Sequence, residues 1–335
     1  MTALWADTVP AALNKPLGTR LSEDVTADVV IVGGGYTGLW TAYHLQMQAP
    51  DLRVTIVEAE QAGFGASGRN GGWCSAHFPA SLPKIARKYG VAAAQAMQST
   101  MHDTVAAIHT TIKREGWQVD AAAGGTVMAA RTPVQLQRAE EEITTWRRFG
   151  FGAEDYRLLT AVETTDRLAA TDVLGGLYTP HCMAIHPAKL IRELATTVVA
   201  RGATLYEDSP AVSLTAGIVR TDHGSVQAPI VVRATEGYTA TIPGHHRDLV
   251  PVYSLMLATE PLSAATWDQI GLAERETFTD LRNLVIYGQR TADDRIAFGG
   301  RGAPYHFGSS IKPEFDQNSL VFQQLWATLI DLFPV

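Results

Sequence analysis

A continuous apolar run, Val-Val-Ile-Val after Asp28, breaks directly into the glycine-rich stretch 33–38. Apolar residues at positions 39, 40, 42 and 45 follow, which is the spacing of one helix face. A second apolar run at 54–57 ends in Glu58, 20 residues after Gly38. This order predicts strand, tight turn, helix and second strand, a βαβ unit that binds a dinucleotide.

The residues of the turn have separate expected roles. Gly33 takes the turn conformation, Gly35 lets the backbone approach a pyrophosphate, and Gly38 permits close packing of the helix on the strand. Tyr36 and Thr37 open the helix, whose unpaired N–H groups favour an anion.

Glu58 stands where an acidic residue binds a ribose hydroxyl. Its carboxylate would repel a 2′-phosphate, so the sequence disfavours NADP. A glycine-rich turn without a ligand is the alternative interpretation, and the acid at this distance argues against it.

Helical periodicity recurs in three later segments. Apolar residues at three- and four-residue spacing predict a helix over 91–112, and Thr132-Pro133-Val134-Gln135 resembles a capping box opening a helix to about Phe149. A third helix follows Pro187, with Gly202 placed to end it.

Short apolar runs at 204–207 and 211–214 predict strands. Further runs at 251–258, 284–288 and 295–299 also read as strands, with a turn at Asp293-Asp294 and no helix expected between them. We therefore expect an antiparallel sheet there, against a parallel sheet at the N-terminal end.

After Glu58 comes Gly63-Phe64-Gly65-Ala66-Ser67-Gly68-Arg69-Asn70-Gly71-Gly72-Trp73, a stretch too rich in glycine for a packed element. Here the chain resembles the D-amino-acid-oxidase-like (DAO) FAD oxidoreductases, and among them the gamma-glutamylputrescine oxidoreductase group. The resemblance continues through 186–190, 231–238 and 299–306. A nicotinamide-only enzyme would leave these segments without a role.

The resemblance implies FAD as cofactor and an α/β fold: a Rossmann-like FAD-binding domain with a parallel sheet and helices, plus an α+β substrate domain with an antiparallel sheet. It also implies two discontinuous domains and an N-terminal extension. The FAD-binding domain comprises residues 25–85 and 181–245, the substrate domain comprises 86–180 and 246–335, and the extension comprises 1–24.

The resemblance also implies cofactor contacts beyond the turn. Arg69 could instead form a surface ion pair, Val212 could be a plain core valine, and Glu236 departs from the usual Ala-Thr-Gly form of its segment. The implied contacts are Ala66, Ser67, Arg69, Asn70, Gly71, Gly72, Val212, Ala234 and Thr235.

Because flavin performs the oxidation itself, no catalytic triad is required. The candidates are assigned from position on the second-domain strands, and ordinary sheet packing or surface solvation is an equally good account of each. The catalytic candidates are Tyr287, Arg301 and His306, and the substrate-binding candidates are Tyr253 and Arg290.

No metal site is expected. His102 and His109 lie beside an apolar helical stripe and read as exposed or edge histidines, and the spacing of His181 and His186 around Pro187 is poor for a metal.

Composition narrows the classes further. With 46% hydrophobic and 18% charged residues the chain is an ordinary globular protein, and a formal net charge of −7 leaves no basic excess for a phosphate backbone. We expect no nucleic-acid partner, no membrane anchor and no secretory signal, hence a cytoplasmic location. Cys74 and Cys182 read as reduced thiols.

The expected function is oxidation of a carbon–nitrogen bond in a small-molecule amine or amino acid, of the gamma-glutamylputrescine or N-substituted amine class, with oxygen as acceptor. One alternative is a flavin dehydrogenase that passes electrons to a carrier. The second alternative is a truncated, non-catalytic nucleotide-binding fragment, because members of the resembled family continue past the point equivalent to Val335.

Overall fold

The computed structural model describes residues 3–334, which form two compact units. Unit 1 comprises residues 3–70, 187–252 and 304–315; unit 2 comprises 71–186, 253–303 and 316–334. The chain passes between the units several times. Residues 71–85 belong to unit 2, where β4 (Trp73–Ser75) pairs with β8 (Cys182–Ala184), and residues 3–24 belong to unit 1.

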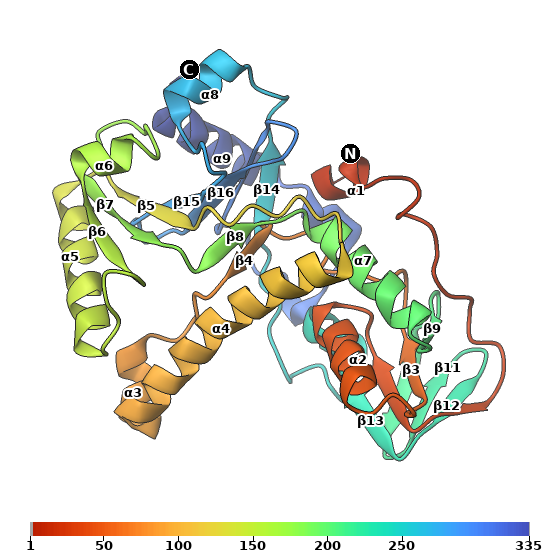
Figure 1. Cartoon of the computed structure of the whole chain (residues 1–335). Helices are drawn as coiled ribbons and strands as arrows, with labels where there is room; N and C mark the ends of the chain where they lie inside the picture. Colours follow the sequence, from red (N-terminus) through yellow and green to blue (C-terminus); the bar gives the residue numbers. More distant parts are fainter. Residues whose placement is uncertain (1–2, 335) are drawn as a thin grey trace. The chain divides into compact units, whose positions relative to one another are not determined.

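Unit 1 is built on a parallel sheet with the strand order β13-β2-β3-β9. The two central strands are buried at every position, including Thr55 of β3, because both faces of the sheet are covered; this fits their almost entirely apolar sequences. Helices α2 (Tyr36–Gln48) and α7 (Pro187–Ala200) pack against each other in this unit (Figure 1). The strands are β2 (Val29–Val32), β3 (Val54–Val57), β9 (Thr204–Tyr206) and β13 (Ile230–Arg233).

A second four-stranded sheet of unit 1 has the order β1-β12-β11-β10. Apolar side chains of the two sheets share a core cluster that includes Val30, Val57, Val219 and Val226. The remaining elements of the unit are β1 (Val25–Thr26), β10 (Ala211–Thr215), β11 (Ile218–Thr221), β12 (Ser225–Gln227), α1 (Leu4–Thr8), and the 3-10 turns η1 (Glu236–Thr241), η2 (Phe307–Ser309) and η3 (Pro313–Asp316, its last residue in unit 2).

Unit 2 contains a seven-stranded sheet with the order β14-β17-β16-β15-β5-β7-β6. All neighbouring pairs are antiparallel except β15 and β5, which are parallel. The expected antiparallel sheet is therefore present with one parallel pairing. Its strands are β5 (Thr126–Ala130), β6 (Arg157–Thr160), β7 (Gly175–Thr179), β14 (Leu255–Ala258), β15 (Thr277–Asp280), β16 (Ile286–Arg290) and β17 (Ile296–Gly300).

Unit 2 also has these helices among the described residues (Figure 1): α3 (Leu82–Tyr89), α4 (Val91–Glu115), on which α3 packs, α5 (Pro133–Arg148), α6 (Ala161–Thr165), α8 (Ala264–Ile270) and α9 (Ser319–Leu332). The expectation of no helix between β14 and β16 is wrong, since α8 and β15 lie there. Ser263 caps α8, and buried Trp267 and Ile270 hold it to the core. The short helix has too few residues to display clear periodicity.

The start of α5 carries half of the expected capping box. Thr132 Oγ1 accepts from Gln135 N at 3.2 Å, whereas Gln135 Oε1 accepts from Arg131 N at 2.7 Å rather than from Thr132. Within residues 3–334, no helix combines the length and apolarity needed to cross a bilayer.

Candidate functional site

The glycine turn after β2 requires glycine for two physical reasons. Gly33 has φ +111°, and a Cβ there would clash with Ala234 O at the end of the neighbouring strand. A Cβ on Gly38 would clash with Gly33 O and lie 3.1 Å from Ile31 Cγ2. The two glycines therefore allow α2 to lie directly on β2, as the motif predicts.

The N-terminus of α2 is the part of the turn suited to an anion. Gly35 is the N-cap residue and supplies no side-chain cap; Tyr36 N instead donates to Ser67 Oγ at 2.9 Å. Among the described residues, only Ser67 comes within 4 Å of the position a Cβ would take on Gly35. This geometry fits a pyrophosphate approaching the backbone, because the first N–H groups of a helix attract negative charge.

Glu58 is anchored at the carboxyl end of β3, beside the turn. Its Oε2 accepts from Gly34 N at 2.6 Å and its Oε1 accepts from Glu60 N at 3.0 Å. Burial raises the pKa of the Glu58 carboxyl, against the lowering effect of these two N–H groups. The side chain thus has a fixed orientation next to the glycines, which fits a ribose contact.

The segment after β3 is shaped by its own side-chain to backbone bonds. Arg69 Nε donates to Phe64 O at 2.7 Å, and the guanidinium lies 4.4 Å from the centroid of the Phe64 ring. Asn70 Nδ2 donates to Ala66 O and Ser67 O, both at 3.0 Å. These bonds order the loop of residues 64–70 beside the glycine turn, and this loop holds several of the predicted cofactor contacts.

The segment after β13 also meets the turn. Ala234 N donates to Val32 O at 2.8 Å, and Thr235 Oγ1 lies 2.8 Å from Thr239 Oγ1. Glu236 has φ +40°, a conformation that favours glycine, so the departure from Ala-Thr-Gly falls where the backbone is strained. Val212, on β10, is 39% exposed, so the core-valine interpretation is wrong.

A buried ion pair that the sequence did not reveal fixes the same region. Arg192 Nη1 lies 3.3 Å from Glu207 Oε1, and the two side chains are only 5% and 3% exposed. Glu207 accepts from the N–H groups of Leu17, Gly18 and Ala62, while Arg192 donates to the carbonyls of Leu13, Lys15 and Ala62. No local motif signals a pair whose partners lie on different elements.

In unit 2, Tyr287 occupies a crowded face of the sheet. Its hydroxyl lies 2.8 Å from Ser254 Oγ, and its ring meets Trp73 edge-on at 6.3 Å between centroids. A Cβ on Gly71 or Gly299 would lie 2.9 or 2.6 Å from the Tyr287 ring. Burial raises the pKa of the Tyr287 phenol, so the hydroxyl stays neutral at ordinary pH.

Gln289 shares this face of β16, since residues two apart in a strand point the same way. The fully buried side chain donates through Nε2 to Gly71 O at 2.8 Å and Gly72 O at 3.0 Å. Its Oε1 and the indole Nε1 of Trp73 are buried without a protein partner in the described structure. Two such polar atoms beside the glycine-rich loop fit a site that a bound molecule completes. Sequence reasoning missed Gln289 and Trp73 here.

Of the other substrate-side candidates, Arg301 lies close enough to Tyr287 for its charge to offset part of the rise that burial causes in the pKa of the phenol. Arg290 points to the opposite face of β16 and pairs with Asp294 at 2.6 Å over the Trp267 ring. Arg301 is exposed just after β17, and Tyr253 packs against the core of unit 2. His306 lies in unit 1, stacked on Phe315 at 3.4 Å, so its expected place on a second-domain strand is wrong.

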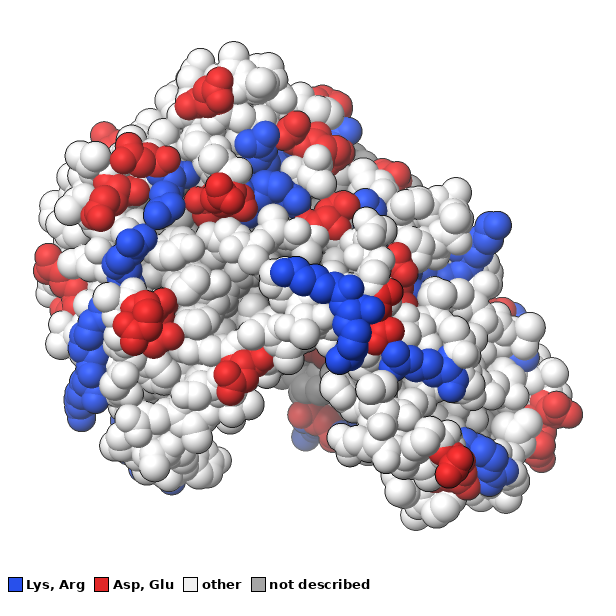
Figure 2. Space-filling view, viewed as in Figure 1, with Lys and Arg blue, Asp and Glu red and all other residues white. Residues whose placement is uncertain are grey.

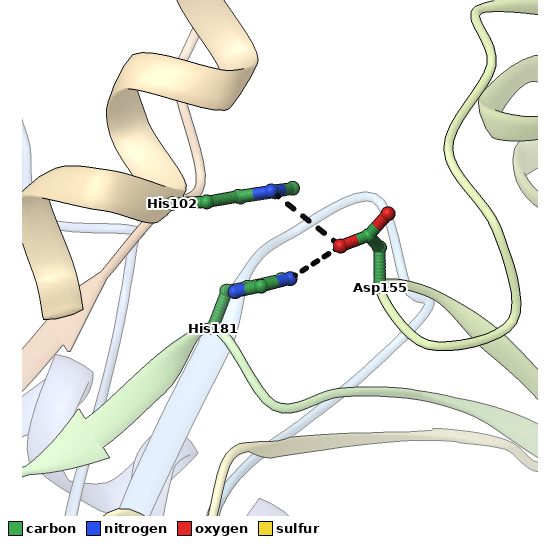
Figure 3. Close-up of side chains that lie close together, drawn as sticks. All are labelled: His102, Asp155 and His181. Atoms are coloured by element: carbon green, nitrogen blue, oxygen red, sulfur yellow. Dashed lines mark hydrogen bonds and ion pairs between the residues drawn. The ribbon is translucent and has the colours of Figure 1, made fainter.

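The expectation that His102 is an exposed or edge residue is also wrong. Its side chain is 11% exposed and stacks on His181 with 3.6 Å between ring centroids, beside Asp155 (Figure 3). Burial, and then the neighbouring His181, lower the pKa of His102 to about 4, so its imidazole is neutral at pH 7.

Acidic and basic side chains are interspersed on the face of the molecule seen in Figure 2, and no broad single-sign surface covers that face.

The carboxyl ends of the parallel strands β2 and β3 thus carry a glycine turn, an open helix N-terminus and an anchored acid. This combination defines a dinucleotide-binding α/β protein. The model of the DAO family, described as FAD dependent oxidoreductase, matches residues 28–335. The chain therefore belongs to this family of enzymes, and its cofactor is FAD.

One relative is gamma-glutamylputrescine oxidoreductase of Escherichia coli (strain K12), 32% identical over 307 residues. That match covers 90% of this chain and 70% of the E. coli protein. It spans both compact units, so the similarity extends well beyond the glycine turn.

Solved structures show the same fold. Glycine oxidase from Geobacillus kaustophilus superposes with a TM-score of 0.69 at 20% identity, covering 92% of this chain and 79% of that one. L-proline dehydrogenase from P. horikoshii gives 0.70 at 17% identity, covering 94% and 78%. An oxidase and a dehydrogenase therefore share this architecture, and the fold alone does not set the electron acceptor.

Proposed function

We propose that the chain oxidises the carbon–nitrogen bond of a small amine or amino acid, with gamma-glutamylputrescine or a related N-substituted amine as the substrate class. The observation that carries this proposal is the match to the E. coli enzyme over 90% of the chain. The buried polar face around Tyr287 and Gln289 supports it, because an amine-bearing substrate requires oriented polar partners.

For the cofactor we propose three groups of contacts. The open N-terminus of α2, from Gly35 through Tyr36 and Thr37, would face the pyrophosphate, and Glu58 would accept from a ribose hydroxyl. The remaining proposed contacts are Gly33, Gly38, Ala66, Ser67, Arg69, Asn70, Gly71, Gly72, Val212, Ala234 and Thr235.

FAD, when bound, supplies the acceptor for a hydride equivalent from the carbon next to nitrogen. The amine nitrogen loses a proton in the same two-electron oxidation, which gives a free imine that water hydrolyses to a carbonyl compound and an amine or ammonia. The task of the chain is to orient the substrate and exclude water.

Tyr287 and Gln289 are the residues we propose for that task. The Tyr287 hydroxyl, neutral and held by Ser254, can bond the substrate nitrogen. Gln289 positions the backbone of Gly71 and Gly72 and so fixes the loop that precedes Trp73. Tyr253, Arg301 and His306 remain predictions from the sequence, whereas Arg290 is engaged by Asp294.

The proposed acceptor is oxygen, and an electron carrier is the second candidate because the fold is common to an oxidase and a dehydrogenase. Oxygen consumption that matches carbonyl formation mole for mole would support the first. Product formation that needs an added carrier dye would support the second.

The test is product analysis on the FAD-loaded 335-residue chain with gamma-glutamylputrescine, N-methylated amino acids and unsubstituted amino acids. We expect an aldehyde or keto product, with a released amine or ammonia, from gamma-glutamylputrescine or from at least one N-methylated amino acid. Bound FAD with no product from any of these compounds would contradict the proposal.

A further inference from the structure

A cluster of two imidazoles and a carboxylate lies in unit 2, and the flavin chemistry proposed above makes no use of it. His102 comes from α4, Asp155 from the segment before β6, and His181 from the turn between β7 and β8 (Figure 3). One nitrogen or oxygen atom of each residue lies within 4.8 Å of the other two. The chain thus brings together three residues that are 26 and more positions apart.

The spacing of these atoms is close to that of ligands around one metal ion. Asp155 Oδ1 is 2.8 Å from His181 Nε2 and 3.7 Å from His102 Nδ1. Tetrahedral Zn²⁺ with bonds of about 2.1 Å holds its ligand atoms roughly 3.4 Å apart. These two distances lie on either side of that value, and the third pair of ligand atoms lies within 4.8 Å.

The surrounding residues orient the cluster as outer partners orient metal ligands. His102 Nε2 lies 2.8 Å from the Tyr156 hydroxyl, which also accepts from Gln98 Nε2 at 2.9 Å. The contact leaves Nδ1 of His102 directed at Asp155, as Figure 3 shows. Gly152 N donates to Asp155 Oδ2 at 3.3 Å, which leaves Oδ1 toward the two histidines. Hydrogen-bonded outer partners of this kind fix the ring orientation of metal-binding histidines.

Exposure of the three side chains is limited but not zero: 11% for His102, 21% for Asp155 and 23% for His181. An ion can therefore enter, and a water molecule can reach the cluster. The rings are stacked with only 6° between their planes, so their nitrogen lone pairs converge on one point only if the rings turn apart.

We propose that His102 Nδ1, His181 Nε2 and Asp155 Oδ1 bind one divalent transition-metal ion, preferably Zn²⁺, with water in the fourth position. Two imidazoles and one carboxylate suit zinc, whereas Mg²⁺ and Ca²⁺ prefer oxygen ligands alone. The ion joins α4 to the sheet strands that flank Asp155 and His181, so the binding stabilises unit 2 by mass action.

Cobalt is the probe for this site, because Co²⁺ reports its coordination by visible absorption and Zn²⁺ displaces it. The tag-free, FAD-loaded chain is freed of metal by a chelator and titrated with Co²⁺ and then Zn²⁺. We expect one equivalent of Co²⁺ with the intense bands of four-coordination, loss of those bands on adding Zn²⁺, and a higher unfolding temperature with Zn²⁺.

Two substitutions identify the ligands. Asp155→Asn keeps the size of the side chain, and His102→Gln keeps a polar group near Tyr156; each is expected to weaken Zn²⁺ binding at least tenfold. His246→Gln makes the same substitution at an exposed histidine of unit 1; it is the matched control and is expected to bind like the parent chain.

Several results would overturn the proposal. One is the absence of Co²⁺ bands and of any Zn²⁺ effect in the parent chain, which would leave a hydrogen-bonded cluster only. Another is binding that survives both substitutions in folded variants, which would assign the ion to another place. Flavin content and amine oxidation are separate measurements, so this test and that of the proposed function can fail independently.

Discussion

The glycine turn of unit 1 and the Tyr287 face of unit 2 are both proposed to serve one reaction, yet they are encoded in different ways. At the turn, Gly35, Glu58 and Ser67 lie within about thirty residues, and the strand–turn–helix order itself brings them together. On β16, Gln289 bonds the carbonyl of Gly71, 218 positions away. A cofactor motif can thus be predicted from a short stretch of sequence. The residues that contact one another on the face of a sheet depend on how distant strands pair.

Replacing the buried Arg192 tests how much the stability of unit 1 depends on an ion pair between distant elements and not only on its local glycine-turn motif. Arg192→Met leaves the Glu207 carboxylate buried without its cation, so we expect a loss of about 3–5 kcal/mol of unfolding free energy. Chemical denaturation measures it, with exposed Arg247→Met as control. A loss below about 1 kcal/mol, as for surface pairs, would mean that the pair does not tie the unit together.

Gly35→Val breaks the motif itself. The added side chain would fill the space on the open side of the turn and meet Ser67 Oγ, so FAD affinity should fall at least about a hundredfold, or roughly 3 kcal/mol. Flavin content and an FAD titration measure the effect. Retention of full FAD occupancy in a folded Gly35→Val protein would remove the pyrophosphate from this turn.

Gln289→Leu is the corresponding break in unit 2. The carbonyls of Gly71 and Gly72 lose their buried donor, and we expect unfolding free energy to fall by about 1–3 kcal/mol. The efficiency kcat/KM for the amine should fall by more than FAD affinity does. Equal losses in both quantities would show that Gln289 supports cofactor binding rather than the substrate side.

The acid sensitivity of unit 2 should depend on His102. Its pKa is about 4 when folded, below the ordinary 6.5, so the unfolded chain takes up the proton first. Stability from the neutral imidazole is therefore complete above pH 6.5 and is lost as the pH falls through 4, by about 1–3 kcal/mol.

Denaturation curves of the metal-free protein between pH 7 and 4, compared with those of His102→Gln, measure this contribution. The variant should lose less stability than the parent chain over that interval. Parallel pH curves for the two proteins would show that His102 titrates normally.

Glu236→Gly has the smallest expected effect. It gives the segment after β13 the Ala-Thr-Gly sequence that is usual in the family. Relief of the positive φ should stabilise the protein by about 1 kcal/mol, reduced by the greater chain entropy of glycine when unfolded. A rise of the unfolding temperature without change in FAD affinity is expected. Destabilisation would mean that the bond from Gly237 N to the Glu236 carboxylate outweighs the strain.

Sequence patterns predicted the elements that carry their own signal. The strands flanking the glycine turn, the helices after Pro133 and Pro187, and the β16–β17 hairpin follow from apolar runs, proline caps and a turn. Helix α8 and strand β15 were missed, since seven and four residues are too few to establish a period.

Only the part of the candidate site that belongs to one local motif could be predicted from the sequence. Gly33, Gly35, Gly38 and Glu58 could be proposed from spacing, because each role belongs to a backbone position in one motif. The Arg192–Glu207 pair, the Gln289 bonds and the His102 cluster join distant elements. Side chains such as Arg290 also turn to one face or the other according to strand register, which composition does not reveal.

Amine oxidation by the bound flavin is tested most directly by the visible flavin absorption of the FAD-loaded chain, followed without oxygen while gamma-glutamylputrescine or another N-substituted amine is added. We expect the band to bleach with the amine and to return on admitting oxygen or a carrier, and we expect no band in Gly35→Val because FAD is not retained. A chain that holds FAD but whose band is unchanged by every amine and amino acid tried would contradict amine oxidation by the flavin.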